Sequence, residues 1–202
     1  MATLDNNCLY VFFENHKRKG WLNEYFGKVV RNDAQKIKSI LKSELEVCNH
    51  IGFLFYDKEW KIAELDYFRG GRIVRNITEN DIKDFQIYPV TKNTDDAMKS
   101  IYDLFKDKLQ KKYWVYSWRR YDFLKCIDYI KDSKIQRGKA EILKLRMLSI
   151  SILKKPSNAG WTCVEVIFHI LDKHQCNPFK IQASPYELLN EISLKDYSQY
   201  SN

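Results

Sequence analysis

Glycine and proline are scarce in this chain, which has only 7 and 4 of them among its 202 residues. Flexible linkers are rich in glycine and stiff linkers in proline, so this scarcity argues against two domains joined by a long linker. Hydrophobic residues make up 45% of the chain and aromatic residues 14%, which supplies enough apolar surface for a core and excludes a disordered chain. We therefore expect residues 1–202 to form a single domain.

Long apolar runs and paired cysteines are also missing. No window approaches the roughly 18 apolar residues of a transmembrane helix, and the first residues lack the positive flank of a signal peptide. The five cysteines are scattered and form no C-x-x-C pair, which argues against a disulfide scaffold and a zinc knuckle. We expect a soluble, cytoplasmic protein with free thiols, no metal and no other cofactor.

Positive charge predominates, with a formal net charge of +8. Charge of this size favours polyanions such as nucleic acid, anionic lipid or cell-wall polymers, but it does not choose among them. The abundance of Lys, Asn, Ile and Tyr is typical of an AT-rich genome, such as that of a virus or a phage.

The hydrophobic pattern predicts an α+β domain in which helices flank an antiparallel sheet. Strands are predicted at residues 9–14, 50–56, 60–67, 72–77 and 85–90. The last of these should be an edge strand, because Pro89 cannot donate a ladder hydrogen bond. Helices are predicted from 33 to about 46, briefly after Thr78, from 95 to about 111, from 162 to about 174, and from 184 to 192. Residues 112–155 are predicted to form a helical insertion within the same domain.

Cys163 directly follows Thr162, the predicted N-cap of a helix whose capping box is completed by Glu165. A thiol is a nucleophile only as thiolate, and the amide groups and dipole at a helix N-terminus favour that form. The alternative is ordinary packing, because cysteine is often buried and Cys163 shares a helix face with Ile167 and Leu171. Position alone leaves both interpretations open.

A nucleophilic cysteine needs a base, and the base needs an orienting group. His50 is the best-placed base because it begins an apolar strand, although it could be an ordinary polar residue at a strand end. Glu64 lies in the next strand and could orient it; alternatively Glu64 faces solvent, and Asp66 is the nearest substitute. The other histidines lie in a charged loop or on the helix of Cys163 itself: His16, His169 and His174.

Three blocks of sequence, taken together, resemble the permuted branch of the NlpC/P60 papain-like superfamily, which includes bacterial amidase-like proteins and a poxviral group. The blocks read N-H-I-G-F-L-F, then I-A-E-L-D-Y-F-R-G-G-R-I-V-R-N-I, and much later W-T-C-V-E-V-I-F-H-I-L. In that family a His opens a strand, an acidic residue follows in the next strand, and a Cys opens a late helix. The closing S-P-Y-E-L-L-N is also similar to the family's terminal segment.

The resemblance implies a permuted papain-like fold and a cysteine hydrolase with Cys163 as nucleophile, His50 as base and Glu64 as orienting group. Such a triad would act through a thioester as an amidase, a peptidase (a thiol protease), an acyl-ester hydrolase or an acyltransferase. Its substrate would be a peptide, an isopeptide, a peptidoglycan crosslink or a lipid acyl group. The chain departs from the family at Val164, where Ser is frequent, and in residues 112–155, which are longer than the family's spacer.

A basic, aromatic segment indicates a different function. Cations and aromatic rings alternate there, among them Lys111, Lys112, Trp114, Trp118, Arg119 and Arg120. Cationic grooves with aromatic platforms bind single-stranded nucleic acid, so the chain could be a nucleic-acid-binding module. The same aromatic side chains could instead pack the insertion. A third interpretation is an inactive papain-like scaffold that only binds.

Overall fold

The computed structural model describes residues 4–15, 31–32, 34–66, 71–92, 94–106, 162–180 and 182–195, which form an α+β domain. The strands are β1 (Leu9–Glu14), β2 (His50–Asp57), β3 (Glu59–Asp66), β4 (Gly71–Asn76) and β5 (Gln86–Thr91). The named helices are α2 (Glu79–Ile82), α3 (Thr94–Lys106), α7 (Cys163–Lys173) and α8 (Pro185–Ser193), and residues 31–32 and 34–41 are also helical. The expected helical insertion at residues 112–155 lies outside the described residues.

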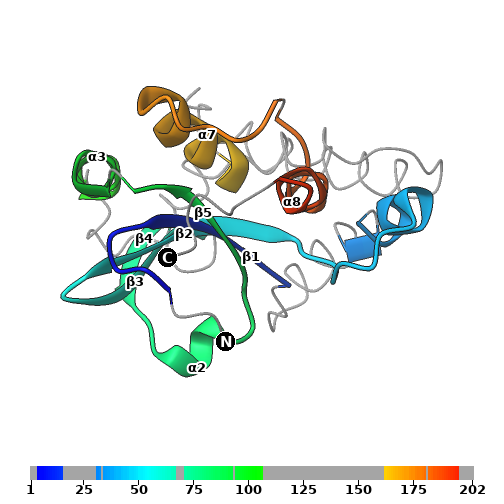
Figure 1. The fold of residues 1–202 in the computed structure, drawn as a ribbon, viewed down its shortest axis with the longest axis horizontal. Helices are drawn as coiled ribbons and strands as arrows, with labels where there is room; N and C mark the ends of the chain where they lie inside the picture. The colour runs from blue at the N-terminus through cyan, green and yellow to red at the C-terminus, as the bar shows by residue number, and fades with distance from the viewer. Residues whose placement is uncertain are drawn as a thin grey trace, which may run out of the picture.

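The five strands form one antiparallel sheet in the order β4-β3-β2-β1-β5 (Figure 1). The alternating and apolar runs of the sequence predicted all five strands, and their ends agree within one or two residues. The prediction of an edge strand at residues 85–90 is confirmed, because among the described strands β5 pairs with β1 alone, at the border of this sheet. Pro89 can lie there because an edge strand leaves one row of backbone groups without a neighbour.

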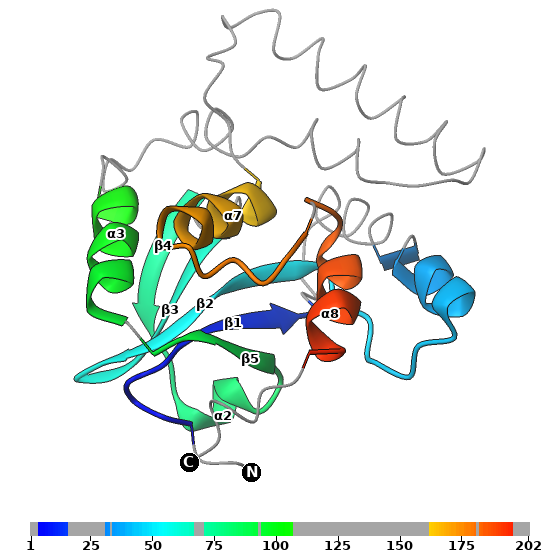
Figure 2. The same ribbon diagram turned by 45° about the horizontal axis from the view of Figure 1, so that its top comes forward.

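Alternate residues of the strands pack into two cores on opposite faces of the sheet. The larger core combines Val11, Phe53 and Leu65 of the sheet with apolar residues of α3, α7 and α8. The smaller core combines Phe12, Leu54 and Ile62 with Ile82 of α2. Figure 2 shows α3, α7 and α8 on one side of the sheet and α2 on the other. Helix α7 packs over β2 and β3.

The helix predicted from residue 33 to about 46 ends earlier, at residue 41. Lys42 has a φ of 50°, in the left-handed region, and the amide of Ser43 donates to the carbonyl of Lys38 at 3.1 Å. This is the hydrogen-bond pattern that closes a helix at a left-handed residue. Helical spacing places Ile40 and Leu41 on the apolar face of this helix and predicts that they pack against the sheet, which is wrong, since they are 78% and 53% exposed.

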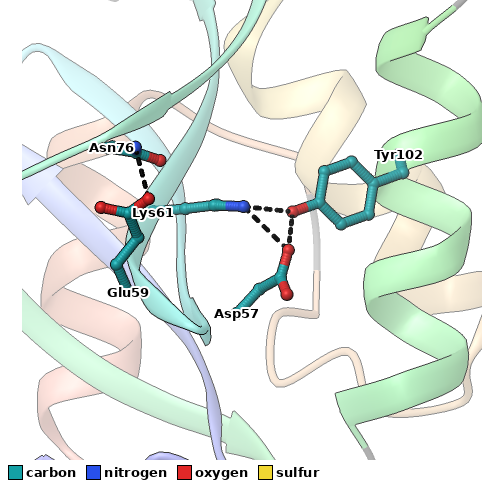
Figure 3. A network of polar contacts seen from close by, with 5 residues as sticks. All are labelled: Asp57, Glu59, Lys61, Asn76 and Tyr102. Atoms are coloured by element: carbon teal, nitrogen blue, oxygen red, sulfur yellow. Dashed lines mark hydrogen bonds and ion pairs between the residues drawn. The ribbon is translucent and has the colours of Figure 1, made fainter.

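A polar network fixes α3 against the hairpin of β2 and β3 (Figure 3). Lys61 Nζ donates to Asp57 Oδ2 at 2.8 Å and to the Tyr102 hydroxyl at 3.2 Å, and that hydroxyl also bonds to Asp57. Beside it, Asn76 donates to Glu59 at 2.7 Å and joins β4 to β3. Across the residues that the structure describes, no helix is long and apolar enough to cross a membrane.

Candidate active site

Cys163 is the first residue of α7, as the capping pattern predicted. The Thr162 hydroxyl accepts from the amide of Glu165 at 3.1 Å, and the Glu165 carboxylate accepts from the amide of Thr162 at 2.8 Å. This reciprocal box satisfies two amide groups and fixes where the helix begins. Cys163 is only 4% exposed and lies at the positive end of the helix dipole. The local sequence thus places a sulfur at a defined point over the sheet.

His50 is the first residue of β2, and it too is almost fully buried. It pairs with Glu14 at the end of β1, and the amide of the preceding Asn49 donates to the carbonyl of Glu14 at 3.0 Å. Pairing with β1 therefore fixes the backbone position of His50.

Glu64 lies diagonally across from His50 on the neighbouring strand. The β2–β3 register pairs Phe53 with Ala63, so Glu64 and His50 project from the same face two residues apart along the sheet. Their side chains meet, with 3.0 Å between His50 Nε2 and Glu64 Oε2. Glu64 is 1% exposed, which makes the alternative of a solvent-facing carboxylate wrong.

Cys163 of α7 contacts the same histidine. The side chains of Cys163 and His50 form a hydrogen bond. Because Nε2 of His50 faces Glu64, Nδ1 is the ring nitrogen left to exchange a proton with the sulfur. Three residues at positions 50, 64 and 163 therefore form one chain of contacts, from thiol to imidazole to carboxylate.

The protonation of His50 is controlled by these two partners. Burial lowers the pKa of the imidazole, but hydrogen bonds to Cys163 and Glu64, together with their negative charges, outweigh it and raise the pKa from 6.5 to about 10. By reciprocity, an imidazolium in this position favours the thiolate form of Cys163. Interacting groups of this kind titrate as a unit, so the sulfur and the ring form a coupled pair.

Arg75 of β4 also belongs to this site, and sequence reasoning missed it. Its Nε donates to Glu64 Oε1 at 3.3 Å, and its side chain is 30% exposed. The register of β3 and β4 pairs Ile62 with Arg75, which places Arg75 and Glu64 on the same face of the sheet. The short connection after β3 was the available signal, because it fixes this register once the two strands are assigned.

The other described cysteines have no comparable setting. Burial, and to a lesser extent the charge of Cys163, raise the pKa of Cys48 well above its ordinary value. Burial likewise raises the pKa of Cys8 to about 11 and raises that of Cys176. All four described cysteines are free thiols. Cys163 is the member of this group that hydrogen-bonds to an imidazole.

The remaining predicted residues lie elsewhere. His169 is exposed on α7, and His174 contacts Ser100 of α3 at 3.0 Å, so both point away from Cys163. His16 and the basic aromatic group of Lys111, Lys112, Trp114, Trp118, Arg119 and Arg120 lie outside the described residues. Within the described ranges, no three His, Cys, Asp or Glu side chains gather in a way that could hold a metal ion.

Comparison with known proteins gives no match: no family model, no curated protein and no solved structure is similar to this chain.

Proposed function

We propose that this protein is a cysteine hydrolase with a permuted papain-like fold, in which Cys163 is the nucleophile, His50 the proton shuttle and Glu64 the orienting group. The observation that carries the proposal is the meeting of a helix-opening thiol with a strand-opening imidazole whose second nitrogen is 3.0 Å from a buried carboxylate. Nucleophile, base and orienter in that geometric order are the signature of acyl-transfer catalysis.

The sequence order of the elements supports the permuted form of the fold. The base and the orienting group lie on adjacent antiparallel strands, and the helix that carries the nucleophile follows them in the chain. This order agrees with the resemblance to the permuted NlpC/P60 branch. The antiparallel sheet with α7 packed over β2 and β3 supplies the layers that such a fold needs.

The reaction begins with the thiolate of Cys163 attacking the acyl carbon of an amide or ester. The electron pair of the carbonyl bond moves to oxygen, and the backbone amide of Cys163 at the N-terminus of α7 stabilises the resulting oxyanion. The tetrahedral intermediate collapses to a thioester, while the His50 imidazolium gives its proton to the departing amine or alcohol. His50, now neutral, takes a proton from water as that water attacks the thioester, and Cys163 leaves as thiolate.

Glu64 contributes by holding the ring rather than by accepting its proton. With Nε2 bonded to the carboxylate, the ring presents Nδ1 to the sulfur. The carboxylate also stabilises the imidazolium that forms whenever Cys163 is a thiolate. The proposed substrate is an amide or an ester, and the candidates are peptide, isopeptide, peptidoglycan and lipid acyl groups.

Alkylation by iodoacetamide tests the proposal, because this small neutral electrophile reports thiolate without requiring a known substrate. At pH 6 we expect Cys163 to be alkylated at least roughly 10-fold faster than Cys176, since an ordinary thiol has a pKa near 8.5 and is then almost fully protonated. Peptide mapping by mass spectrometry gives the rate at each cysteine.

His50→Gln is the decisive variant in this experiment. It should reduce the Cys163 rate at pH 6 to that of an ordinary thiol, while His174→Gln, the matched control at the C-cap of α7, should leave the rate unchanged. A wild-type Cys163 that reacts no faster than Cys176 would exclude the hydrolase. The protein would then be an inactive scaffold or a nucleic-acid-binding module.

A further inference from the structure

Arg75 contacts the outer end of the triad. Its Nε lies 3.3 Å from Oε1 of Glu64, while Oε2 of the same carboxylate lies 3.0 Å from Nε2 of His50. One buried carboxylate on β3 is therefore shared between a guanidinium on β4 and an imidazole on β2. The side chain of Glu64 is 0% exposed and that of Arg75 is 30% exposed, so the ion pair runs from the interior to the surface.

We propose that Arg75 is a positioning residue of this site: it holds one oxygen of Glu64 so that the other faces His50, and it draws part of the carboxylate's negative charge away from the imidazole. The inference rests on the proposed function for its description of the triad as catalytic. The contacts among His50, Glu64 and Arg75 do not depend on whether the triad is catalytic.

Sharing the carboxylate has a chemical consequence for His50. The ring must hold a proton beside the thiolate and then release it to the leaving group. A buried carboxylate with no second cation would bind the imidazolium more tightly and oppose that release. The guanidinium offsets this effect, because a positive charge beside Glu64 lowers the pKa of His50. Removing it should therefore raise the pKa of His50.

Other groups around His50 must stay constant for this effect to be measured. Within the described ranges, the titratable residues that contact His50, pair with it or lie next to it in sequence are Cys163 of α7, Glu64 of β3, Glu14 opposite it on β1, and Cys48 just ahead of β2. Cys163 is one of the causes that raise the pKa of His50 to about 10. Replacing it by Ala moves the titration towards neutral pH and separates the measurement from catalysis.

The experiment follows the His50 ring signal by NMR as a function of pH in the full-length Cys163→Ala protein. Adding Arg75→Gln, which removes the charge but keeps an amide donor, should raise the pKa of His50 by roughly 0.5–1 unit. Arg75→Lys, which keeps the charge, should leave it within about 0.3 unit. In a Glu64→Gln background, Arg75→Gln should raise the pKa of His50 less, because only the direct repulsion between the two cations remains once the carboxylate is gone.

Lys61→Gln is the matched control. Lys61 is also a cation paired with a carboxylate on this sheet, but it lies opposite Phe55, about five residues or roughly 16 Å along β2 from His50. It should leave the His50 titration unchanged. Thermal unfolding followed by circular dichroism confirms that each variant is folded, and Arg75→Thr, with its high strand propensity, replaces Arg75→Gln if that variant does not fold.

An unchanged or lowered pKa of His50 in Arg75→Gln would overturn the inference, as would an equal shift in the Glu64→Gln background. The outcome is separable from the proposed function. If Cys163 proves unreactive towards iodoacetamide while the pKa shift is observed, the hydrolase fails and the role of Arg75 stands. If Cys163 is reactive and the shift is missing, only the role of Arg75 fails.

Discussion

Gly52 lies between His50 and Leu54 on the same face of β2, and its missing side chain is what allows Phe12 to pack there. A Cβ atom at this position would lie 2.6 Å from Cζ of Phe12 and would also collide with its Cε1. Phe12 cannot move aside easily, because it is fully buried and stacked on Phe85 at 4.4 Å between ring centroids. The same ring lies edge-on to His50, at 6.3 Å. The glycine therefore allows Phe12 to pack beside His50 in the candidate site.

Gly52→Ala should lower the free energy of unfolding by roughly 1–3 kcal/mol, the usual cost of overpacking a core. Phe12→Leu in the same chain should relieve part of the collision, so the two changes should be less than additive. Urea unfolding of both single variants and the double variant measures this. Strict additivity would show that the Phe12 ring does not set the requirement for glycine.

At the scale of secondary structure, α7 and α8 begin with the same capping motif. Thr162 and Ser184 are their N-caps, and each forms a reciprocal capping box with a glutamate three residues later. The box at α7 directly precedes Cys163, whereas no member of the candidate triad follows the box at α8. The two helices thus provide a matched pair for separating helix stability from cysteine chemistry.

Thr162→Ala and Ser184→Ala should each cost about 1 kcal/mol of stability, the typical effect of losing an N-cap. Only Thr162→Ala should also slow alkylation of Cys163 at pH 6, because fraying of the first turn of α7 moves the sulfur away from His50. Urea unfolding and iodoacetamide kinetics give the two readouts. Equal alkylation rates in the two variants would show that this capping box does not position the sulfur.

The elements were largely predictable because each depends on local pattern. The five strands follow apolar or alternating runs, and α3, α7 and α8 follow a helical repeat with capping residues at two of their starts. The predicted end of the first helix, near residue 46, was wrong because Lys42 adopts a left-handed conformation. Lysine carries no sequence signal for that conformation, unlike glycine.

For the whole molecule, the buried thiols outside the candidate site act in one direction. Cys8, Cys48 and Cys176 all have pKa values raised in the folded state. The folded protein therefore keeps protons that the unfolded chain releases, and the free energy of unfolding falls as pH rises. The contribution of Cys8 is complete below pH 9 and is lost by about pH 11. The proton that His50 gains on folding is the one that Cys163 loses as a thiolate, so this pair adds no net dependence of stability on pH between 6.5 and 9.

We therefore expect stability to decrease from pH 9 to 11, as measured by urea unfolding under reducing conditions. His50→Gln should show a similar decrease, because it keeps the buried thiols that titrate there. A stability that is constant or rises over this range in the wild type would contradict the raised pKa of Cys8.

Residue types and local patterns in the sequence determined much of this protein: five strands, several helices, a cysteine at a helix N-terminus, and a histidine at a strand start. They also identified Glu64 as a candidate partner, because neighbouring strands of a tight hairpin have a predictable register. These features depend on interactions within a few residues, which a sequence displays directly.

Only the tertiary structure decided that Cys163 meets His50, residues separated by most of the chain, and that Arg75 holds the far oxygen of Glu64. The burial of Glu64, rather than its exposure, was decided there as well. The physical reason is that these contacts depend on how α7 packs over β2 and β3, and on how strands combine into one sheet. No local pattern encodes that packing.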